Sequence, residues 1–221
     1  MITVEKLVKK YGKNENEFIA LDTVSLKIKS GSTLAIIGKS GSGKSTLMHI
    51  MSGLDRPTSG KIVIDDVDLF SMKSREMDNF RTSKMSFIFQ AFFIQANQTV
   101  YQNVMLPLQI AKVPRAKRKE LVMEALKSVE LETKVDNLAN NLSGGQKQRL
   151  AIARAIVNKP HILFADEPTG NLDSVTGDRI MKLLFDLNKQ IGCTIILVTH
   201  DPDLANQCQA QIQLKDGKIT A

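Results

Sequence analysis

Long apolar runs are missing from this sequence of 221 residues. None approaches the roughly 20 residues that a membrane-spanning helix needs, and no signal peptide opens the chain. We therefore expect a cytoplasmic protein that reaches a membrane only through a partner. Hydrophobic residues still make up 43% of the chain, which is enough apolar surface for a full core. The length is long for one domain and short for two.

Cysteine is scarce, and its two positions exclude the usual structural uses of this residue. Cys193 and Cys208 lack the spacing of a metal site. Cys193 also lies in an apolar, strand-like run. We interpret both residues as reduced thiols and not as a disulfide.

Aromatic residues are few, at 5% of the chain, and they do not alternate with the basic residues. The net charge of +7 would suit nucleic acid, but this missing pattern argues against it. An anionic membrane surface or plain solvation explains the charge equally well. We expect no direct nucleic-acid partner. We interpret the basic residues at 112–119 as a solvated helix face, and the alternative is a specific anion site.

The chain is organised around residues 34–46. The apolar run Leu34–Ile37 is typical of a buried parallel strand. Glycines then allow a tight turn and leave room for a ligand, and a helix is expected to begin near Lys44. The pattern G-x-x-x-x-G-K-S is the phosphate-binding P-loop. Its alternative interpretation is a glycine-rich turn without a ligand.

Each part of this loop has a chemical task in binding a nucleoside triphosphate. Backbone N–H groups of the turn and of the helix start form an anion trap. Lys44 adds a point charge for the terminal phosphates, and the Ser45 hydroxyl can ligate Mg²⁺. The nucleotide-binding residues predicted here are Gly38, Lys39, Ser40, Gly41, Ser42, Gly43, Lys44, Ser45 and Thr46.

The remaining chain divides into strands and a helical middle. Alternating patterns predict an antiparallel layer, and compact apolar runs predict buried parallel strands. In the middle of the chain the spacing of the apolar residues becomes that of a helix. Gly192 is placed to end a later helix. We expect antiparallel strands at 2–8, 24–28 and 61–65, parallel strands at 85–89, 161–165 and 193–199, helices within 99–157 and at 174–190, and a final hairpin that turns at 216–217.

Polar residues directly follow the predicted parallel strands: Gln90, the pair Asp166–Glu167, and His200. The carboxyl ends of parallel strands meet at one edge of a sheet, where ligands bind in such folds. The P-loop strand ends at that edge too. We therefore expect four strand ends to form one active site.

The types of these residues suit phosphoryl transfer. Asp166 is predicted to hold Mg²⁺, and Glu167 to act as general base on the water that attacks the γ-phosphate. Gln90 either ligates the metal or orients that water. His200 either hydrogen-bonds the γ-phosphate or holds the water's geometry. The alternative for Asp166–Glu167 is a polar loop after a strand.

A second anion trap is predicted at residues 142–146, Leu-Ser-Gly-Gly-Gln. Ser143 and Gln146 have capping-box spacing, and Ser143, Gly144 and Gly145 leave the helix N-terminus open to an anion. One nucleotide cannot use both traps if they lie on different subdomains. The simplest arrangement is a head-to-tail homodimer that holds each ATP between two chains. The alternative is an ordinary capped helix.

In this order, the motifs resemble those of the ATPase subunit of ATP-binding cassette transporters. The resemblance covers essentially the whole chain, and no catalytic position departs from the family pattern. The signature Leu-Ser-Gly-Gly-Gln is far more specific than a P-loop alone. The matching segments are Gly38–Ser45, Gln90, Leu142–Gln146, Ile162–Glu167 and His200.

The resemblance implies an α/β fold with a P-loop NTPase core and parallel sheet, an antiparallel β subdomain and an inserted α-helical subdomain. The expected arrangement is a single domain over residues 1–221 with the helical subdomain at about 90–158. It also implies ATP and Mg²⁺ as cofactors. The ATPase would drive a separate membrane permease from the inner face of the cell membrane.

The resemblance also assigns roles by position. Tyr11 corresponds to the aromatic residue that stacks on adenine. Phe18 is a nearby rival, and core packing is the alternative for either. Residues Gly170–Asp173 correspond to the loop through which paired subunits communicate.

Two further segments, Gly53–Gly60 and Thr169–Asp173, resemble the macrolide-export and lipoprotein-release ATPases. That branch suggests export, or extraction of a substrate from the membrane. Within it, the alternative is a mechanical regulator of the cell-division type, which transports nothing. The cassette ATPases of DNA repair and translation are a more distant alternative, since this chain lacks their coiled coil, zinc modules or second cassette. Because the chain ends soon after His200, we expect no C-terminal regulatory domain of the sugar-importer kind.

Overall fold

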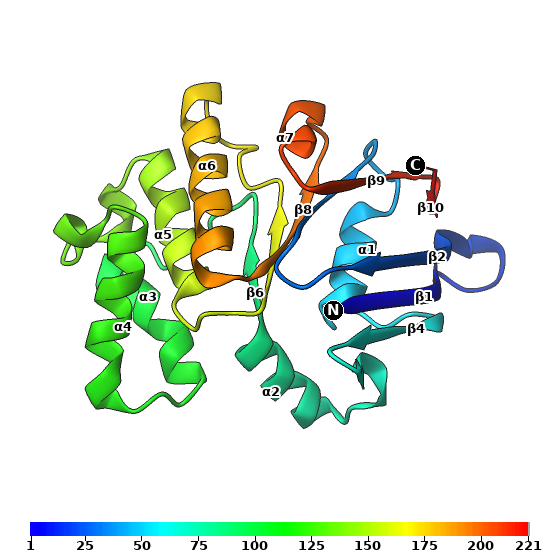
Figure 1. The fold of residues 1–221 in the computed structure, drawn as a ribbon, viewed down its shortest axis with the longest axis horizontal. Coiled ribbons are helices and arrows are strands. Elements are labelled where there is room, and N and C mark those ends of the chain that lie inside the picture. Colours follow the sequence, from blue (N-terminus) through cyan, green and yellow to red (C-terminus); the bar gives the residue numbers. More distant parts are fainter. Residues whose placement is uncertain (221) are drawn as a thin grey trace. The chain divides into compact units, whose positions relative to one another are not determined.

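The computed structural model describes residues 1–220, apart from the Glu15 side chain. Two compact units make up the chain (Figure 1). The first consists of residues 1–81 and the segment from Thr194 onward, and the second of residues 82–193. Helix α2 (Ser74–Lys84) runs from the first unit into the second.

An antiparallel sheet occupies the N-terminal part of the first unit. Its strand order is β2-β1-β4-β5, and Ile2 pairs with Ile28 on one side and with Ile64 on the other. These isoleucines are buried, as the alternating pattern predicts for a sheet with one face in the core. The strands are β1 (Ile2–Tyr11), β2 (Phe18–Ile28), β4 (Ser59–Ile64) and β5 (Val67–Asp68).

Parallel strands in the same unit hold the glycine-rich loop. Strand β3 lies between β8 and β9 and runs parallel to both. Strand β9 turns into β10 through Asp216 and Gly217, both with positive φ, as a two-residue hairpin turn requires. The elements are β3 (Thr33–Ile37), α1 (Lys44–Met51), β8 (Thr194–Thr199), α7 (Pro202–Asn206), β9 (Ala210–Lys215) and β10 (Lys218–Ile219).

The second unit combines two parallel strands with four α-helices that follow the end of α2. Strand β6 pairs with β7 in parallel, with Ile88 opposite Ala165. Gly192 ends the long helix α6 in the left-handed conformation, at φ +70°. The elements are β6 (Met85–Ile88), α3 (Val100–Ile110), α4 (Arg115–Ser128), α5 (Gly144–Ile156), β7 (Ile162–Asp166) and α6 (Ser174–Ile191).

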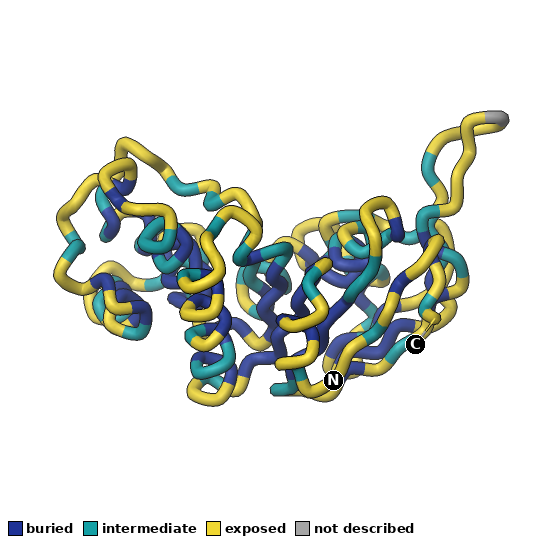
Figure 2. Tube along the Cα trace, turned by 90° about the horizontal axis from the view of Figure 1, so that it is seen from above, coloured by how far each residue is buried: buried dark blue, intermediate teal, exposed yellow. Residues whose placement is uncertain are grey.

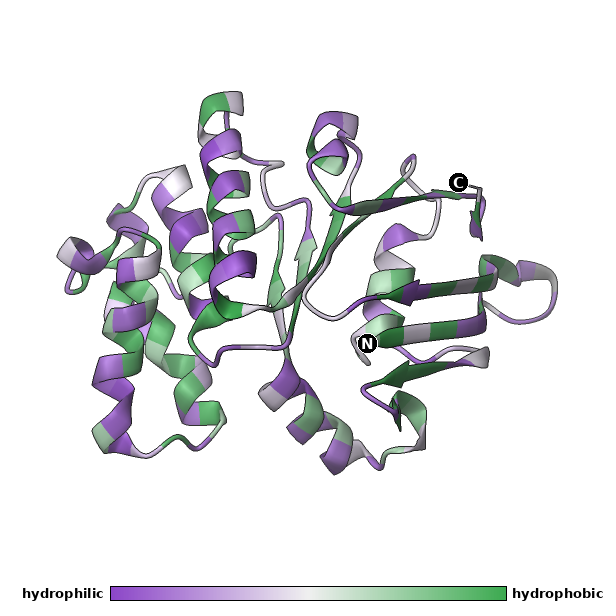
Figure 3. Ribbon diagram, viewed as in Figure 1, coloured by the Kyte–Doolittle hydropathy of each residue, from purple (hydrophilic) through white to green (hydrophobic). Residues whose placement is uncertain are grey.

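Burial follows the apolar runs of the sequence. Every residue of β8 is buried, and that strand is hydrophobic over most of its length (Figure 3). Within each unit the strands and inner helices carry the buried positions, whereas the connecting loops are largely exposed (Figure 2). The rigid strands thus form a scaffold, and the loops at their ends are available for binding.

The structure confirms the predicted α/β class, with parallel and antiparallel strands as expected. Helices α3, α4 and α5 lie within the interval 90–158 that was expected to be helical. The assignment of that interval as a subdomain of a single domain stays a prediction. Each helix in the described part of the chain is too short or too polar to span a bilayer.

Candidate functional site

The glycine-rich loop connects β3 to α1 in the first unit, where the sequence predicts it. Gly43 is the N-cap of α1 and has φ +102°. A Cβ atom at Gly43 would lie 2.5 Å from the carbonyl oxygen of Ala20, and one at Gly38 would lie 2.3 Å from that of Leu214. Both positions therefore require glycine, because backbone packs directly against the loop.

The loop presents its polar groups at the start of α1. The Lys44 ammonium donates to the carbonyl oxygens of Gly38 at 2.8 Å and Lys39 at 3.0 Å, so it lies across the loop. Ser42 is buried, and its hydroxyl has no hydrogen-bond partner among residues 1–220. Of the other predicted residues, Lys39, Ser40, Gly41 and Ser45 are exposed, whereas Gly38, Gly43, Lys44 and Thr46 are partly buried.

His200 lies at the same sheet edge as this loop. Ile37 at the end of β3 pairs with Thr199 at the end of β8. Gly38 and His200 therefore leave adjacent parallel strands side by side, and the His200 side chain is exposed. The structure thus brings two of the predicted strand ends together within the first unit.

Polar contacts fix the ring of Tyr11 at the end of β1. Its hydroxyl donates to Asp55 Oδ2 at 2.6 Å. Lys9 Nζ pairs with Asp55 Oδ1 at 2.8 Å and lies 4.6 Å from the Tyr11 ring centroid. The Phe18 ring is 5.6 Å away, centroid to centroid. Tyr11 remains partly exposed. Its assignment to adenine stacking stays a prediction, as does that of its rival Phe18.

The ionisation of this pair favours the observed hydrogen bond. Burial and the bond to Asp55 raise the pKa of Tyr11, so the phenol keeps the proton that it donates. Burial opposes ionisation of Asp55, but hydrogen bonds from Lys9, Tyr11 and the backbone outweigh it and lower the pKa of this carboxyl. At neutral pH the arrangement is a phenol donor on a carboxylate acceptor.

The second unit brings together Gln90, Asp166 and Glu167. Ile88 pairs with Ala165, so the segments that follow β6 and β7 leave the sheet side by side. Asn171 Nδ2 donates to the carbonyl oxygen of Gln90 at 2.8 Å. The loop after Glu167 therefore contacts the segment that begins at Gln90.

Arg154 of α5 fixes the backbone just beyond Gln90. Its guanidinium donates to the carbonyl oxygens of Phe93 at 2.6 Å and Phe92 at 2.9 Å. Burial lowers the pKa of Arg154, but an arginine remains charged in a protein. Both hydrogen bonds are thus charge-assisted.

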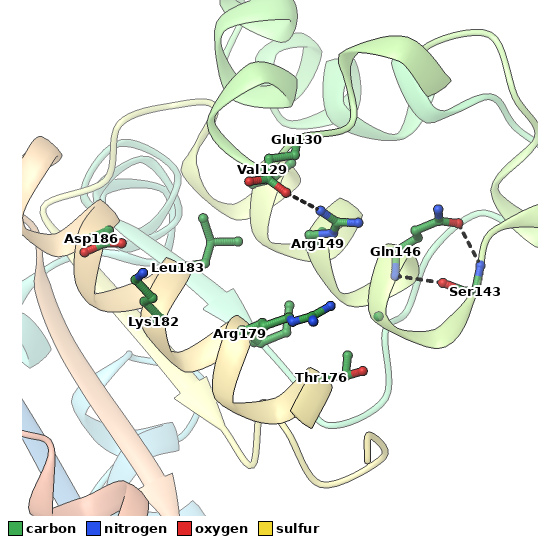
Figure 4. Close-up of a pocket in the computed structure, with 12 residues that line it drawn as sticks. Val129, Glu130, Ser143, Gln146, Arg149, Thr176, Arg179, Lys182, Leu183 and Asp186 are labelled. Carbon is green, nitrogen blue, oxygen red and sulfur yellow. Dashed lines mark hydrogen bonds and ion pairs between the residues drawn. The ribbon is translucent and has the colours of Figure 1, made fainter. Parts of the chain in front are cut away.

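The predicted capping box at the start of α5 is present. Gln146 N donates to Ser143 Oγ at 3.4 Å, and Ser143 N donates to Gln146 Oε1 at 3.0 Å (Figure 4). A Cβ atom at Gly145 would lie 2.6 Å from Thr176 Cγ2, so this glycine permits close packing against α6. The other signature glycine, Gly144, is exposed.

A pocket of about 640 Å³ borders this helix start in the second unit. Signature residues line it on one side and the first turns of α6 on the other (Figure 4). The charged residues of the lining are Arg149, Arg179, Lys182, Glu130 and Asp186, and Arg149 pairs with Glu130 at 2.9 Å. The predicted anion trap thus borders a hollow lined by charges of both signs.

The structure places the predicted site residues in two groups. The P-loop, His200 and Tyr11 belong to the first unit, and Gln90, Asp166, Glu167 and the signature belong to the second. The meeting of all four strand ends in one active site stays a prediction.

Sequence reasoning missed two side chains that support these groups, Gln148 and Arg154 of α5. Gln148 is fully buried and donates to the carbonyl oxygen of Pro168. The sequence does offer one indication of Gln148. It is a polar residue at helical spacing from Ala151 and Ile152, on the face of the helix that is buried.

The two cysteines are free thiols, as predicted. Burial raises the pKa of both Cys193 and Cys208 to about 11. Because the thiolate is the reactive form, we expect the folded protein to react slowly with iodoacetamide near neutral pH and rapidly in guanidinium. Mass spectrometry of the alkylated protein measures both rates. Prompt alkylation of the native protein would contradict the raised pKa values.

Comparison with known proteins adds to this geometry. A family model described as ABC transporter matches residues 21–170. The lipoprotein-releasing system ATP-binding protein LolD of Syntrophotalea carbinolica is 44% identical over 220 residues, which cover 100% of this chain and 97% of that protein.

Solved structures give the same result. The ATP-binding cassette MJ0796, as a post-hydrolysis dimer bound to ADP and Pi, has a TM-score of 0.89 and 40% identity, over 100% of this chain and 97% of that one. For cbiO1 of Clostridium perfringens the TM-score is 0.90 at 34% identity, over 100% and 86%. The chain therefore belongs to the ABC transporter family and is an ATP-binding cassette ATPase.

Proposed function

We propose that this chain hydrolyses ATP in a head-to-tail homodimer, and that binding and hydrolysis drive a membrane permease. The observation that carries the proposal is the presence in one chain of two glycine-containing helix starts of the kind that can bind an anion. One is the loop before α1 in the first unit, and the other is the capped start of α5 in the second. In a head-to-tail dimer, each ATP takes the P-loop of one chain and the signature of the other.

The residues of the loop before α1 fit the phosphates of ATP. A Cβ atom at Gly41 would meet nothing within 4 Å, so the loop is open there. The buried Ser42 hydroxyl lacks a partner within the described chain, and the Lys44 ammonium lies across the loop. These groups match the donors and the positive charge that a polyphosphate needs.

Mg²⁺ is the cation proposed to accompany the phosphates of ATP. When bound, it neutralises charge on the β- and γ-phosphates. Mg²⁺ usually takes only one or two protein ligands together with phosphate oxygens and water. Accordingly, residues 1–220 contain no cluster of three or more His, Cys, Asp or Glu side chains that could hold a metal by themselves. Ser45, Asp166 and Gln90 are the proposed protein ligands.

The remaining roles concern water and the γ-phosphate. Glu167 accepts the proton of the attacking water as general base. His200 and Gln90 hold the γ-phosphate and the water in position. Hydrogen bonds fix the backbone of the turn that carries Glu167, and a fixed backbone restricts where a catalytic side chain can lie.

The proposed partner is a permease at the inner face of the cell membrane. The LolD relative is named for a lipoprotein-releasing system, and cbiO1 is described as part of an ABC transporter complex. Both support a cassette that works on a membrane component. The LolD relative further supports export or extraction from the membrane as the direction of work.

Reconstitution with a candidate permease, sought among the neighbouring reading frames, tests the proposal. We expect the two proteins to copurify in detergent and the permease to change the rate of ATP hydrolysis in liposomes. A cassette with Lys44→Ala is the matched control, and it should bind the permease without hydrolysing ATP. If the proteins do not associate and the rate is the same with and without the permease, the proposed coupling is wrong.

A further inference from the structure

Gln148 is a buried amide in the signature helix α5. Its side chain has 0% exposure, and its Nε2 donates to the carbonyl oxygen of Pro168 at 2.6 Å. Pro168 directly follows Glu167, the proposed general base, and is itself buried. A single side-chain hydrogen bond therefore connects α5 to the turn that carries the base.

The backbone at Glu167 needs such a restraint. Glu167 has φ +47°, a region that residues other than glycine seldom adopt. The residue before a proline is also ordinarily extended. Unfavourable backbone conformations persist only where the surrounding structure holds them. Here Gly170 N donates to the carbonyl oxygen of Glu167 at 3.0 Å, and Gln148 holds the next carbonyl.

Core packing alone does not explain a glutamine at this place. Its Oε1 is buried and has no hydrogen-bond partner among the described residues. A buried polar atom without a partner is destabilising, and an apolar side chain of similar length avoids that cost. Ala151 and Ile152 continue the same stripe of the helix and are buried apolar residues. Unlike an apolar residue at this position, glutamine forms the hydrogen bond to the Pro168 carbonyl oxygen.

We propose that Gln148 is a positioning residue, which holds the turn after Glu167 and thereby aims the Glu167 carboxylate. The proposal rests on the proposed function, in which Glu167 is the base. It also gives α5 a double task. The helix is capped by Ser143, which faces the ATP of the partner chain in the proposed dimer. The same helix restrains the base that acts on this chain's own ATP.

Substitution by methionine separates positioning from packing. Gln148→Met keeps the length and removes the donor. Because the buried Pro168 carbonyl then loses this hydrogen bond, we expect the melting temperature to fall modestly. The value of kcat should fall by about tenfold to 10²-fold, the scale of a misplacement of about 1 Å. The KM for ATP should be unchanged, since the P-loop carries binding. Steady-state ATP hydrolysis and thermal unfolding measure these quantities.

Asn188 of α6 offers a matched control. Its side chain is 6% exposed, and its Nδ2 donates to the carbonyl oxygen of Cys193 at 2.5 Å, away from the turn after Glu167. Asn188→Leu likewise removes a buried donor to a backbone carbonyl. We expect it to lower stability and to leave kcat per folded molecule unchanged. Equal kcat values for Gln148→Met and the wild type would overturn the proposal.

A second pair of variants covers the case that Gln148→Met does not fold. Burial raises the pKa of a carboxyl group, so in Gln148→Glu a protonated carboxyl donates to Pro168 at low pH. As pH rises through that pKa the donor is lost, and kcat relative to the wild type should fall. Asn188→Asp loses a donor in the same manner and should not show this fall per folded molecule. Parallel profiles for the two variants would refute positioning.

The two proposals fail in different ways. If Glu167→Gln keeps wild-type turnover, the assignment of the base is wrong, and the role of Gln148 falls with it. If Glu167→Gln is inactive while Gln148→Met is fully active, only the positioning role is wrong.

Discussion

Replacing Glu167 with glutamine should leave ATP binding intact and nearly abolish turnover. The amide keeps the shape and the hydrogen-bonding reach of the carboxylate, but it cannot accept the proton of the attacking water. Loss of a general base typically costs a factor of about 10²–10⁴ in rate. ATP should therefore remain bound, and the ATP-bound dimer should accumulate. Light scattering with ATP and Mg²⁺ would detect the dimer, and phosphate release would measure turnover.

Glu124 provides the control for this substitution. It lies in α4 with 54% side-chain exposure and pairs with Lys159, so Glu124→Gln makes the same chemical change at a surface position. Its turnover should equal that of the wild type. If Glu167→Gln also hydrolyses ATP at the wild-type rate, Glu167 is not the base, and the proton must go to another group.

Two inactive chains should recover activity when they form a mixed dimer. One chain carries Lys44→Ala, which removes a charge-assisted contact worth about 1.5–3 kcal/mol, or about tenfold to 150-fold in ATP affinity. The other carries Ser143→Arg, which replaces the capping hydroxyl of α5 with a bulky cation. In a head-to-tail dimer, one interface then combines both defects, and the other pairs an intact P-loop with an intact signature.

The measured quantity is activity or, if both sites must work together, occluded ATP. We expect partial recovery of hydrolysis, or about one trapped nucleotide per mixed dimer. A purified dimer of the wild type with a chain that carries both substitutions is the reciprocal control. It places one defect at each interface in the head-to-tail arrangement and should be inactive. Recovery in this control, without recovery in the mixed dimer, would mean that Ser143 acts on its own chain's ATP.

The sequence predicts most elements of this fold because their patterns are local. The P-loop pattern fixes the end of β3 and the start of α1 at Lys44. Capping chemistry predicts the start of α5 at Ser143, and a glycine predicts the end of α6 at Gly192. Each of these boundaries depends on residues within a few positions of it, so it can be read without knowledge of the fold.

Elements without a strong local pattern escape prediction. Helix α2 is almost entirely polar and buries only Met77, so it has no apolar stripe to detect. Helix α7 is only five residues long, although Asp201 and Pro202 at its start are a typical beginning of a helix. The hairpin turn at Gly217 is predictable, but the pairing of β9 alongside β3 is not.

In the candidate site, too, residues in local motifs are predictable and residues that act through tertiary contacts are not. Sequence motifs identify the groups that are proposed to touch ATP. The side chains that support them, Asp55 beside Tyr11 and Gln148 beside Pro168, are far from their partners in the sequence. The positive φ of Glu167 is likewise a product of tertiary contacts, and no propensity of glutamate or of the proline after it favours that conformation.

The packing behind the P-loop has a consequence for synthesis on the ribosome. Leu34 of β3 pairs with Ala210, and Gly217 N donates to the carbonyl oxygen of Ser42 at 3.1 Å. The ATP-binding loop is translated long before the backbone that shapes it. Contacts so distant in sequence form slowly. A nascent chain should therefore gain its affinity for ATP only when residues 210–217 have left the exit tunnel, so that nucleotide binding is acquired long after the loop itself has been made.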